Sequence, residues 1–420
     1  MIRKGLILAL AVPLLLYCRA SRQLAPPDPV FAQINGIVKT LSDIAGLDER
    51  HEVAYGRMSQ QQLRRFLARR IKETLKPKEI YADELTLKLF GLVPQDFDLK
   101  KSTVDLLTEQ AAAFYDYQEK KLFLLDVSSV SSEETTLAHE LSHALADQHF
   151  DLEKYVDDNN DDDDENLAHT AVVEGQASWL MLAYQRRQEG LTGPPSSTQL
   201  ETIIKAADSS SGEYPVLESS PLYIQQSLLF PYTEGTLFFN NVYRKLGRRA
   251  FETVFLNPPA GSAQIYHPAL YFSHFRPTAP EVPNPDFEGG QRELTSGSLG
   301  EFDQRMLLWQ FTGRSNAERL SPHALGAQYR IVEVGRRHRR PVLEYASEWD
   351  SEASAGDYFS AYSDALRKKW KQCDATSRTS TLFSGSAERG YFITRRKGRF
   401  VTSIEGIPNE RDWRRLLGRE

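Results

Sequence analysis

The residues with the clearest chemical potential are two histidines and a glutamate within one short stretch. His139 and His143 are four residues apart in AHELSHALADQHF (138–150), and Glu140 directly follows the first of them. Residues four apart in a helix differ by about 40° around its axis and by about 6 Å along it, so both imidazoles can bind one metal ion. This spacing suits Zn²⁺ held by two neutral imidazoles, with the neighbouring carboxylate accepting a proton from the bound water. We therefore predict His139 and His143 as zinc ligands and Glu140 as a general base.

A helix over 131–149 is needed to position these side chains. Ser131 and Glu134 have the spacing of a capping box, which favours the start of a helix at this point. An apolar stripe then continues along one face of the segment at Leu137, Leu141, Ala144 and Leu145. The two histidines are therefore predicted to lie inside a helix.

A third zinc ligand has three candidates further along the chain. His149 follows His143 by six residues, the spacing found in metzincins, but a continuous helix turns it roughly 240° away from His143. Asp147 lies on the ligand face one turn further on, where we expect it to support an imidazole. Glu174 is our choice, because it lies on an otherwise apolar helix face, where a charge is costly unless it is paired or coordinated. The alternatives are His149 as the ligand and Glu174 paired with an arginine.

The composition describes a globular chain with no broad attraction to polyanions. The 420 residues are 40% hydrophobic and 10% aromatic, and their formal net charge is −6. We therefore expect two or three packed domains and no nucleic-acid partner. The basic run GRRHRR (335–340) is expected to be a solvated hairpin tip between strands near 328–334 and 341–347.

The first twenty residues, MIRKGLILALAVPLLLYCRA, have the pattern of a secretory signal. A basic start precedes an apolar run that is shorter than the ~20 residues of a membrane-spanning helix, so cleavage after Ala20 is expected. The alternative is a lipid anchor on Cys18, although bulky Tyr17 stands where such motifs place a small residue. The protein is therefore expected to be secreted or periplasmic, or to be anchored to a membrane as a lipoprotein.

Hydrophobic periodicity predicts an α+β fold that is mainly helical. Residues 21–110 are expected to form a tether and a helical N-terminal region, and residues 111–126 a strand pair. Further helices are expected over 131–149, 167–188, 197–208 and 220–246.

The last third of the chain is predicted to be a loop-rich segment and a small α+β unit, together covering 276–420. Six prolines indicate loop-like structure over 257–299. The unit itself is predicted from helices over 300–313 and 351–370 and from strands near 328–347 and 390–406. A separate acidic run, 157–165, is expected to be a solvated loop, with a calcium site as the alternative.

Several segments resemble one family of enzymes. HELSHALADQ resembles the metal-binding helix of gluzincin metallopeptidases, the thermolysin-like clan, and VEGQAS resembles the helix that carries their third ligand. With FPYTEG (230–235) and PPAGSAQIYHPALYF (258–272), the chain is similar to a group of secreted bacterial proteins predicted to be zinc peptidases. This resemblance implies a zincin-like catalytic core over 111–275, with zinc bound by His139, His143 and Glu174. It also implies Tyr232 and His267 as hydrogen-bond donors to the oxyanion of the reaction.

The predicted activity is hydrolysis of peptide bonds in a peptide or protein substrate, with Zn²⁺ as cofactor and Glu140 as general base. An extended peptide is expected to add to the edge of the strand pair over 112–125. Ser178 departs from the family, because thermolysin-like enzymes place there an aspartate that orients a histidine ligand. The alternative function is a non-enzymatic envelope protein that keeps a zincin fold for a structural metal or a partner. Glu140 favours the enzyme, since a structural site has no need of a proton acceptor.

Overall fold

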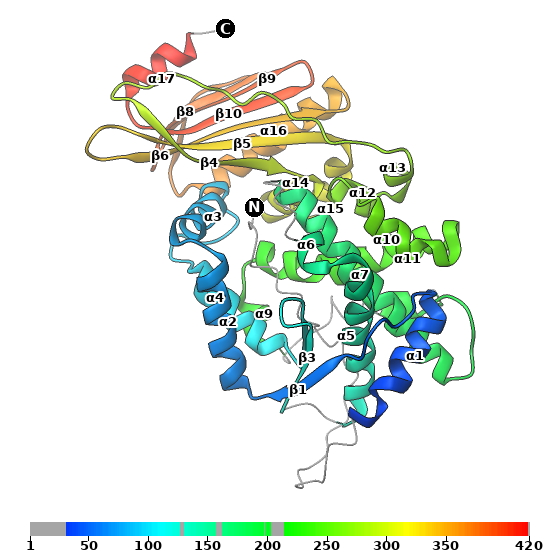
Figure 1. Cartoon of the computed structure of the whole chain (residues 1–420). Coiled ribbons are helices and arrows are strands. Elements are labelled where there is room, and N and C mark those ends of the chain that lie inside the picture. The colour runs from blue at the N-terminus through cyan, green and yellow to red at the C-terminus, as the bar shows by residue number, and fades with distance from the viewer. Residues whose placement is uncertain (1–30, 127–129, 157–161, 197, 203–213, 419–420) are drawn as a thin grey trace.

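The computed structural model describes residues 31–126, 130–156, 162–196, 198–202 and 214–418. The fold is α+β and mainly helical, as predicted, with a helical part that carries a three-stranded sheet and a C-terminal part built on a seven-stranded sheet (Figure 1). The predicted signal over 1–20 and the alternative anchor Cys18 lie outside the described residues. Among the described residues, no helix has both the length and the apolar character needed to cross a membrane.

Four helices form most of the N-terminal region. They are α1 (Ile34–Ala45), α2 (Gln60–Thr74), α3 (Pro77–Phe90) and α4 (Leu99–Gln110). The start of α2 is fixed by Ser59, whose side chain accepts a hydrogen bond from the Gln62 N–H in a capping box. The inner face of α2 then buries residues at helical spacing, namely Leu63, Phe66, Leu67 and Ile71.

The helical prediction for this region is wrong at residues 54–58, which form strand β1 (Ala54–Met58). This strand pairs in parallel with β3 (Lys121–Leu125), which lies far along the chain. Most of β1 is exposed, so its sequence has no apolar alternation that would have indicated a strand. Pairing with β3, rather than local preference, gives the segment its conformation.

A hairpin completes the three-stranded sheet, as predicted for residues 111–126. Strand β2 (Ala113–Asp116) pairs with β3 in antiparallel fashion, and the strand order β1-β3-β2 leaves β2 at an edge. β2 contacts helix α5 (Val130–Phe150), which agrees with the helix predicted over 131–149. The side chain of Ser131, predicted as the cap, lies outside the described residues.

Three long helices form the centre of the helical part. Helix α7 (Asp163–Gln188) contacts both α5 and α10 (Leu222–Leu246), so the helices predicted over 167–188 and 220–246 are confirmed. Of the helix predicted over 197–208, residues 198–202 are helical and the others lie outside the described residues. Short helices complete this part: α6 (Leu152–Val156), α9 (Pro215–Ser219), α11 (Ala250–Leu256), α12 (Ser262–Tyr266) and α13 (Pro268–Phe272).

The loop-like prediction for 257–299 is wrong at both ends of the segment. Helices α12 and α13 lie in its first half, and strand β4 (Gln291–Leu299) forms its end. β4 is an edge strand that pairs antiparallel with β5 (Ala324–Val334). Its sequence, QRELTSGSL, is mostly polar, so the strand could not be recognised by alternation. Residues 273–290 between these elements have no helix or strand, as predicted from their prolines.

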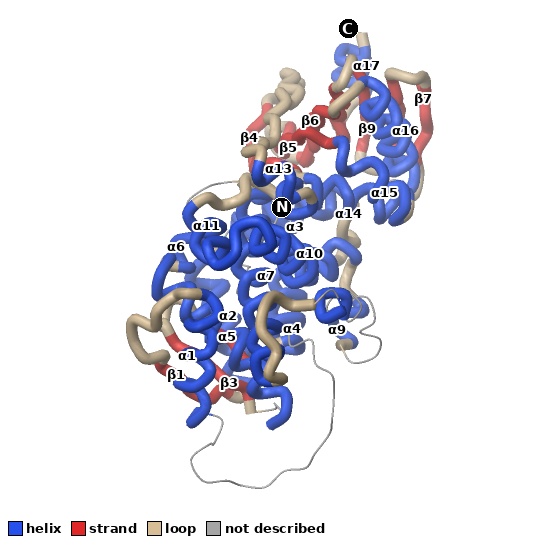
Figure 2. Tube along the Cα trace, turned by 90° about the vertical axis from the view of Figure 1, so that its right-hand side faces the viewer, coloured by secondary structure: helices blue, strands red, loops and turns tan. Residues whose placement is uncertain are grey.

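The C-terminal sheet is entirely antiparallel, with strand order β4-β5-β6-β10-β9-β8-β7. Helices α14 and α16 pack against this sheet, and their buried side chains belong to the main apolar core. Helix α17 packs against the sheet at a second, smaller apolar cluster (Figure 2). Residues 336–339 are exposed between β5 and β6, which confirms the predicted basic hairpin tip. The remaining strands and helices are β6 (Arg340–Trp349), β7 (Cys373–Arg378), β8 (Leu382–Ala387), β9 (Gly390–Lys397), β10 (Phe400–Ile407), α14 (Glu301–Thr312), α15 (Arg314–Leu320), α16 (Glu352–Lys369) and α17 (Glu410–Leu417).

The helical part and the C-terminal sheet share one apolar core. Phe90, at the end of α3, packs edge-on against Tyr329 and Tyr345 of the sheet, with ring centroids 5.7 and 5.8 Å apart. Lys369 of α16 donates a hydrogen bond to the carbonyl of Leu89 at 3.0 Å. These contacts pack the C-terminal part onto the end of α3 in the helical part.

The acidic run 157–165 is in part the start of α7. Residues 157–161 lie outside the described residues, and Asp162 caps the helix by accepting from the N–H groups of Asp164 and Glu165. Asp163 and Asp164 are buried, so the prediction of a solvated loop is wrong for these two residues. The described acidic residues of the run do not form a group that could hold a metal ion.

Asp164 is expected to make the stability of the fold depend on pH. Burial raises the pKa of this carboxyl to about 8, and the charge of Asp303 adds to the effect, although the hydroxyl and N–H of Ser262 stabilise the charged form. The unfolded chain releases this proton near pH 3.8. The folded state therefore binds more protons between these values, and the free energy of unfolding should fall as pH rises from about 4 to about 8.

The size of this effect can be measured by denaturant unfolding at pH 5, 6.5 and 8. Each pKa unit corresponds to about 1.4 kcal/mol, so a loss of about 2 to 5 kcal/mol is expected across the range. Asp164→Asn cannot ionise and should make the dependence on pH clearly weaker. An equally steep dependence in this variant would show that Asp164 is not its source.

Candidate metal centre

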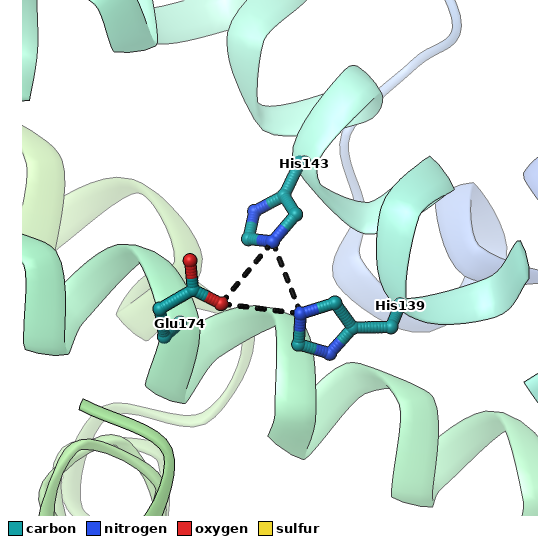
Figure 3. Close-up of side chains that lie close together, drawn as sticks. All are labelled: His139, His143 and Glu174. Carbon is teal, nitrogen blue, oxygen red and sulfur yellow. Dashed lines mark hydrogen bonds and ion pairs between the residues drawn. The ribbon is translucent and has the colours of Figure 1, made fainter. Parts of the chain in front are cut away.

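Two packed helices bring the three predicted zinc ligands together (Figure 3). α5 carries His139 and His143 one turn apart, and α7 carries Glu174. His139 Nε2 lies 3.1 Å from His143 Nε2, and Glu174 Oε2 lies 3.2 Å and 3.4 Å from these two nitrogens. All three side chains are buried, with residue exposures of 4%, 1% and 1% in chain order. This buried group can hold a metal ion.

The charge of Glu174 is stabilised by the two imidazoles. Burial by itself would raise the pKa of this carboxyl, but His143 and His139 lower it to about 2 through their charge and hydrogen bonds. Glu174 is therefore ionised at neutral pH, as a metal ligand must be. A buried carboxylate facing two nitrogen donors is a donor set that suits a divalent cation such as zinc.

Asp147 does not support an imidazole, so that prediction is wrong. Its carboxylate accepts hydrogen bonds from the Tyr115 hydroxyl and the Leu152 N–H, and it pairs with Lys120, each at 2.9 Å. Tyr115 and Lys120 belong to the β2–β3 hairpin, so Asp147 fastens this hairpin to α5. The Nδ1 atom of His143 has no hydrogen-bond partner among the described residues.

Glu140 lies beside the ligands without belonging to their group. Its side chain is fully buried, and its Oε2 accepts a hydrogen bond from the Tyr115 N–H at 2.7 Å. Leu125 donates to the Ala112 carbonyl on the inner side of the hairpin, so the alternation of an antiparallel pair turns the backbone groups of Tyr115 towards the outer edge of β2. The edge strand thus orients the Glu140 carboxylate, an arrangement that a base for proton transfer needs.

Of the two predicted oxyanion donors, Tyr232 lies next to the group of His139, His143 and Glu174, whereas His267 contacts Glu301. The Tyr232 ring lies 6.0 Å from the His139 ring between centroids. Burial, followed by the charges of Glu174 and Glu140, raises the pKa of Tyr232 well above its ordinary value, so its hydroxyl stays protonated. His267 instead has its Nε2 within 3.0 and 3.1 Å of the two Glu301 carboxylate oxygens.

His149, the alternative third ligand, points to a different neighbour. Its Nε2 donates a hydrogen bond to the carbonyl oxygen of Asp48 at 2.8 Å. The continuous α5 helix keeps this ring away from His139 and His143, as the helical geometry predicted. Glu174, and not His149, shares the group with the two histidines.

Two tyrosines of the hairpin, Tyr115 and Tyr117, are site residues that the sequence did not single out. Tyr115 donates to both Glu140 and Asp147, and the Tyr117 ring faces His143 with centroids 6.1 Å apart. The available signal was the alternation of these tyrosines on a strand predicted to precede the metal-binding helix. Their contacts with α5 depend on how the hairpin docks, which a local pattern does not encode.

A contact between two glycines sets how closely α7 and α10 approach each other. A Cβ atom on Gly175 would lie 2.1 Å from the carbonyl carbon of Gly235, and a Cβ on Gly235 would lie 2.2 Å from the Ala171 carbonyl oxygen. Glu174 directly precedes Gly175, and Tyr232 lies one turn before Gly235. The glycine pair therefore determines the separation of the two helices that carry Glu174 and Tyr232.

Gly175→Ala is expected to destabilise the fold and to weaken metal binding. The methyl group meets backbone atoms, which can move only if the helices separate, so a loss of about 1 to 3 kcal/mol in unfolding free energy is expected. Gly36→Ala is the matched control, because no atom of the described residues lies within 4 Å of a Cβ added there in helix α1. Urea unfolding and zinc titration of both variants test this, and equal effects at the two positions would contradict the role of the glycine contact.

No protein-family model, curated protein or solved structure matches the chain. The resemblance to gluzincins therefore rests on the sequence motifs alone. The site itself is defined by its geometry, which is a buried group of two histidines and a glutamate on packed helices, with a second, strand-oriented glutamate beside it.

Proposed function

We propose that this protein is a zinc-dependent peptidase that hydrolyses peptide bonds in a peptide or protein substrate. The observation that carries this proposal is the position of Glu140. This carboxylate is buried next to His139, is oriented by the Tyr115 N–H, and is not part of the group that can hold the metal. A structural zinc site is usually closed by four protein ligands and does not require such a group.

Each residue of the site has a distinct role in the proposed reaction. His139, His143 and Glu174 would hold the zinc, which supplies a Lewis acid and an activated water when it is bound. Glu140 accepts a proton from the attacking water and then delivers it to the nitrogen of the leaving amine. The hydroxyl of Tyr232 donates a hydrogen bond to the carbonyl oxygen of the substrate as negative charge develops there. His267, placed with Glu301, has no role in this proposal.

We further propose that the strand pair, α5 and α7 form a zincin-like core of the gluzincin type. The arrangement of a ligand-bearing helix beside an edge strand, followed by a helix with a glutamate ligand, supports this assignment. An extended peptide would bind along β2, where the backbone of Ala113 faces the outer edge like that of Tyr115. All four residues of β2 are buried, so the peptide needs local displacement of the side chains that cover this edge.

A non-enzymatic envelope protein with a structural metal is the second candidate. The low exposure of the ligands favours it, because a closed metal site stabilises a fold without admitting a substrate. The oriented Glu140 argues against it. Secretion or a periplasmic location agrees with either function. Both of these locations are predicted from the signal sequence over 1–20.

The two candidates are separated by two measurements on the purified mature chain. The first is its metal content, and the second is cleavage of an unbiased peptide library by the metal-loaded protein. One bound zinc with a defined cleavage pattern supports the peptidase. One bound zinc without cleavage of any peptide supports the structural metal, and a chain that binds no zinc contradicts both.

A further inference from the structure

Tyr117 lies against the candidate metal centre from the side of the hairpin. It is the first residue after β2, and its ring meets the His143 ring at 78° with centroids 6.1 Å apart. The turn that carries it is held by Asp116, whose Oδ1 accepts from the N–H groups of Gln118 and Glu119 at 2.8 and 3.2 Å. The other oxygen of Asp116 pairs with Arg70 of α2. Local contacts of the hairpin therefore fix the position of Tyr117.

The hydroxyl of Tyr117 is buried and has no hydrogen-bond partner among the described residues. Other buried tyrosine hydroxyls of the protein are satisfied, such as those of Tyr115 with Asp147 and Tyr223 with Asp303. A buried hydroxyl without a partner is destabilising, so natural proteins retain one mainly where it serves a function or binds a molecule. The Tyr117 hydroxyl is thus a donor that is available to a ligand.

The position of Tyr117 brings this hydroxyl to the candidate metal centre, because its ring packs against that of His143, a proposed metal ligand. A tyrosine hydroxyl has an ordinary pKa of about 10, so it keeps its proton at neutral pH and can act as a hydrogen-bond donor.

We infer that Tyr117 is a second catalytic donor, whose hydroxyl hydrogen-bonds to the carbonyl oxygen of the scissile peptide bond. Tyr117 approaches from the hairpin beside His143, and Tyr232 approaches from α10 beside His139. The two hydroxyls would share the negative charge that develops on this oxygen, and neither would transfer its proton. This inference rests on the proposed peptidase function and adds a contact between the enzyme and its substrate.

Tyr117→Phe tests the inference, because it removes the hydroxyl and keeps the ring against His143. Loss of one such donor typically lowers kcat by about 10²- to 10³-fold, and KM should change by less than about threefold. The affinity for a phosphinic peptide, whose tetrahedral phosphinate resembles the reacting state, should fall at least about tenfold by calorimetry. Zinc content should stay at one, and the melting temperature should stay equal or rise, since an unsatisfied buried hydroxyl is lost.

Tyr184→Phe is the matched control, because the Tyr184 hydroxyl donates to Glu134 at 2.6 Å. It should leave kcat and phosphinate affinity unchanged. If Tyr117→Phe cleaves peptides like the wild type and binds the phosphinate equally well, Tyr117 is not a donor. The inference then fails, while the proposed peptidase function still holds. If Tyr117→Phe loses zinc or melts at a lower temperature, the hydroxyl is structural and the inference also fails. If the wild type holds zinc but cleaves no peptide, the proposed function fails, and the inference fails with it.

Discussion

Glu140→Gln is expected to lower turnover of peptide substrates at least about 100-fold while zinc stays bound. The glutamine keeps the shape of the side chain, and its amide oxygen can still accept the Tyr115 N–H. It cannot accept a proton from water at neutral pH, so only proton transfer is lost. Steady-state kinetics, zinc analysis and a melting curve on one preparation check the prediction.

A matched control for Glu140→Gln is available on the same helix. Glu134 accepts a hydrogen bond from the Tyr184 hydroxyl and is not part of the metal-binding group, so Glu134→Gln should retain wild-type turnover. If Glu140→Gln also retained wild-type turnover, the measured activity would belong to another site or to a contaminant, and the assignment of Glu140 as base would fall.

Glu174→Ala is expected to strip zinc from the protein at neutral pH. Removing a residue that only supports a ligand typically costs 10- to 100-fold in metal affinity, so removing a direct ligand should cost more than about 100-fold. The buried histidines would also lose the carboxylate that lies 3.2 and 3.4 Å from their Nε2 atoms. Zinc content after dialysis against a weak chelator measures the effect.

His149→Ala is the comparison variant for Glu174→Ala. His149 bonds to the Asp48 carbonyl, so its removal should leave zinc bound and turnover intact. The ligand assignment would be overturned if His149→Ala lost zinc while Glu174→Ala kept it. Both variants should be examined at the same pH, because protons compete with zinc for imidazole and carboxylate ligands.

The two histidines of the group that could hold a metal ion were predictable from sequence, because their relative position follows from the helix itself. His139 and His143 are four residues apart, and a regular helix places such residues on one side whatever surrounds them. Glu174 was identified from its apolar surroundings on a second helix, and the structure brings it to the two histidines. Tyr232 came from the resemblance to gluzincins, because nothing in its local pattern indicates the metal centre.

Other features depend on contacts between distant segments, and local patterns did not predict them. The position of Asp147 on the ligand face of α5 predicts a hydrogen bond to an imidazole. Its carboxylate instead contacts Tyr115 and Lys120 of the hairpin that packs on this helix. The strands β1 and β4 lie at sheet edges and are largely polar or exposed, so only their partner strands identify them. The long helices α7 and α10 were predicted close to their observed bounds.

The hydrogen bond from the Tyr115 N–H to Glu140 has a consequence for how this site can vary during evolution. The donor belongs to the main chain, so every residue type except proline at position 115 retains it. The orientation of the Glu140 carboxylate therefore depends on the pairing of β2 with β3 and not on the identity of a side chain. If the proposed peptidase function holds, substitutions of the hairpin side chains can change substrate preference during evolution without changing the direction of this carboxylate.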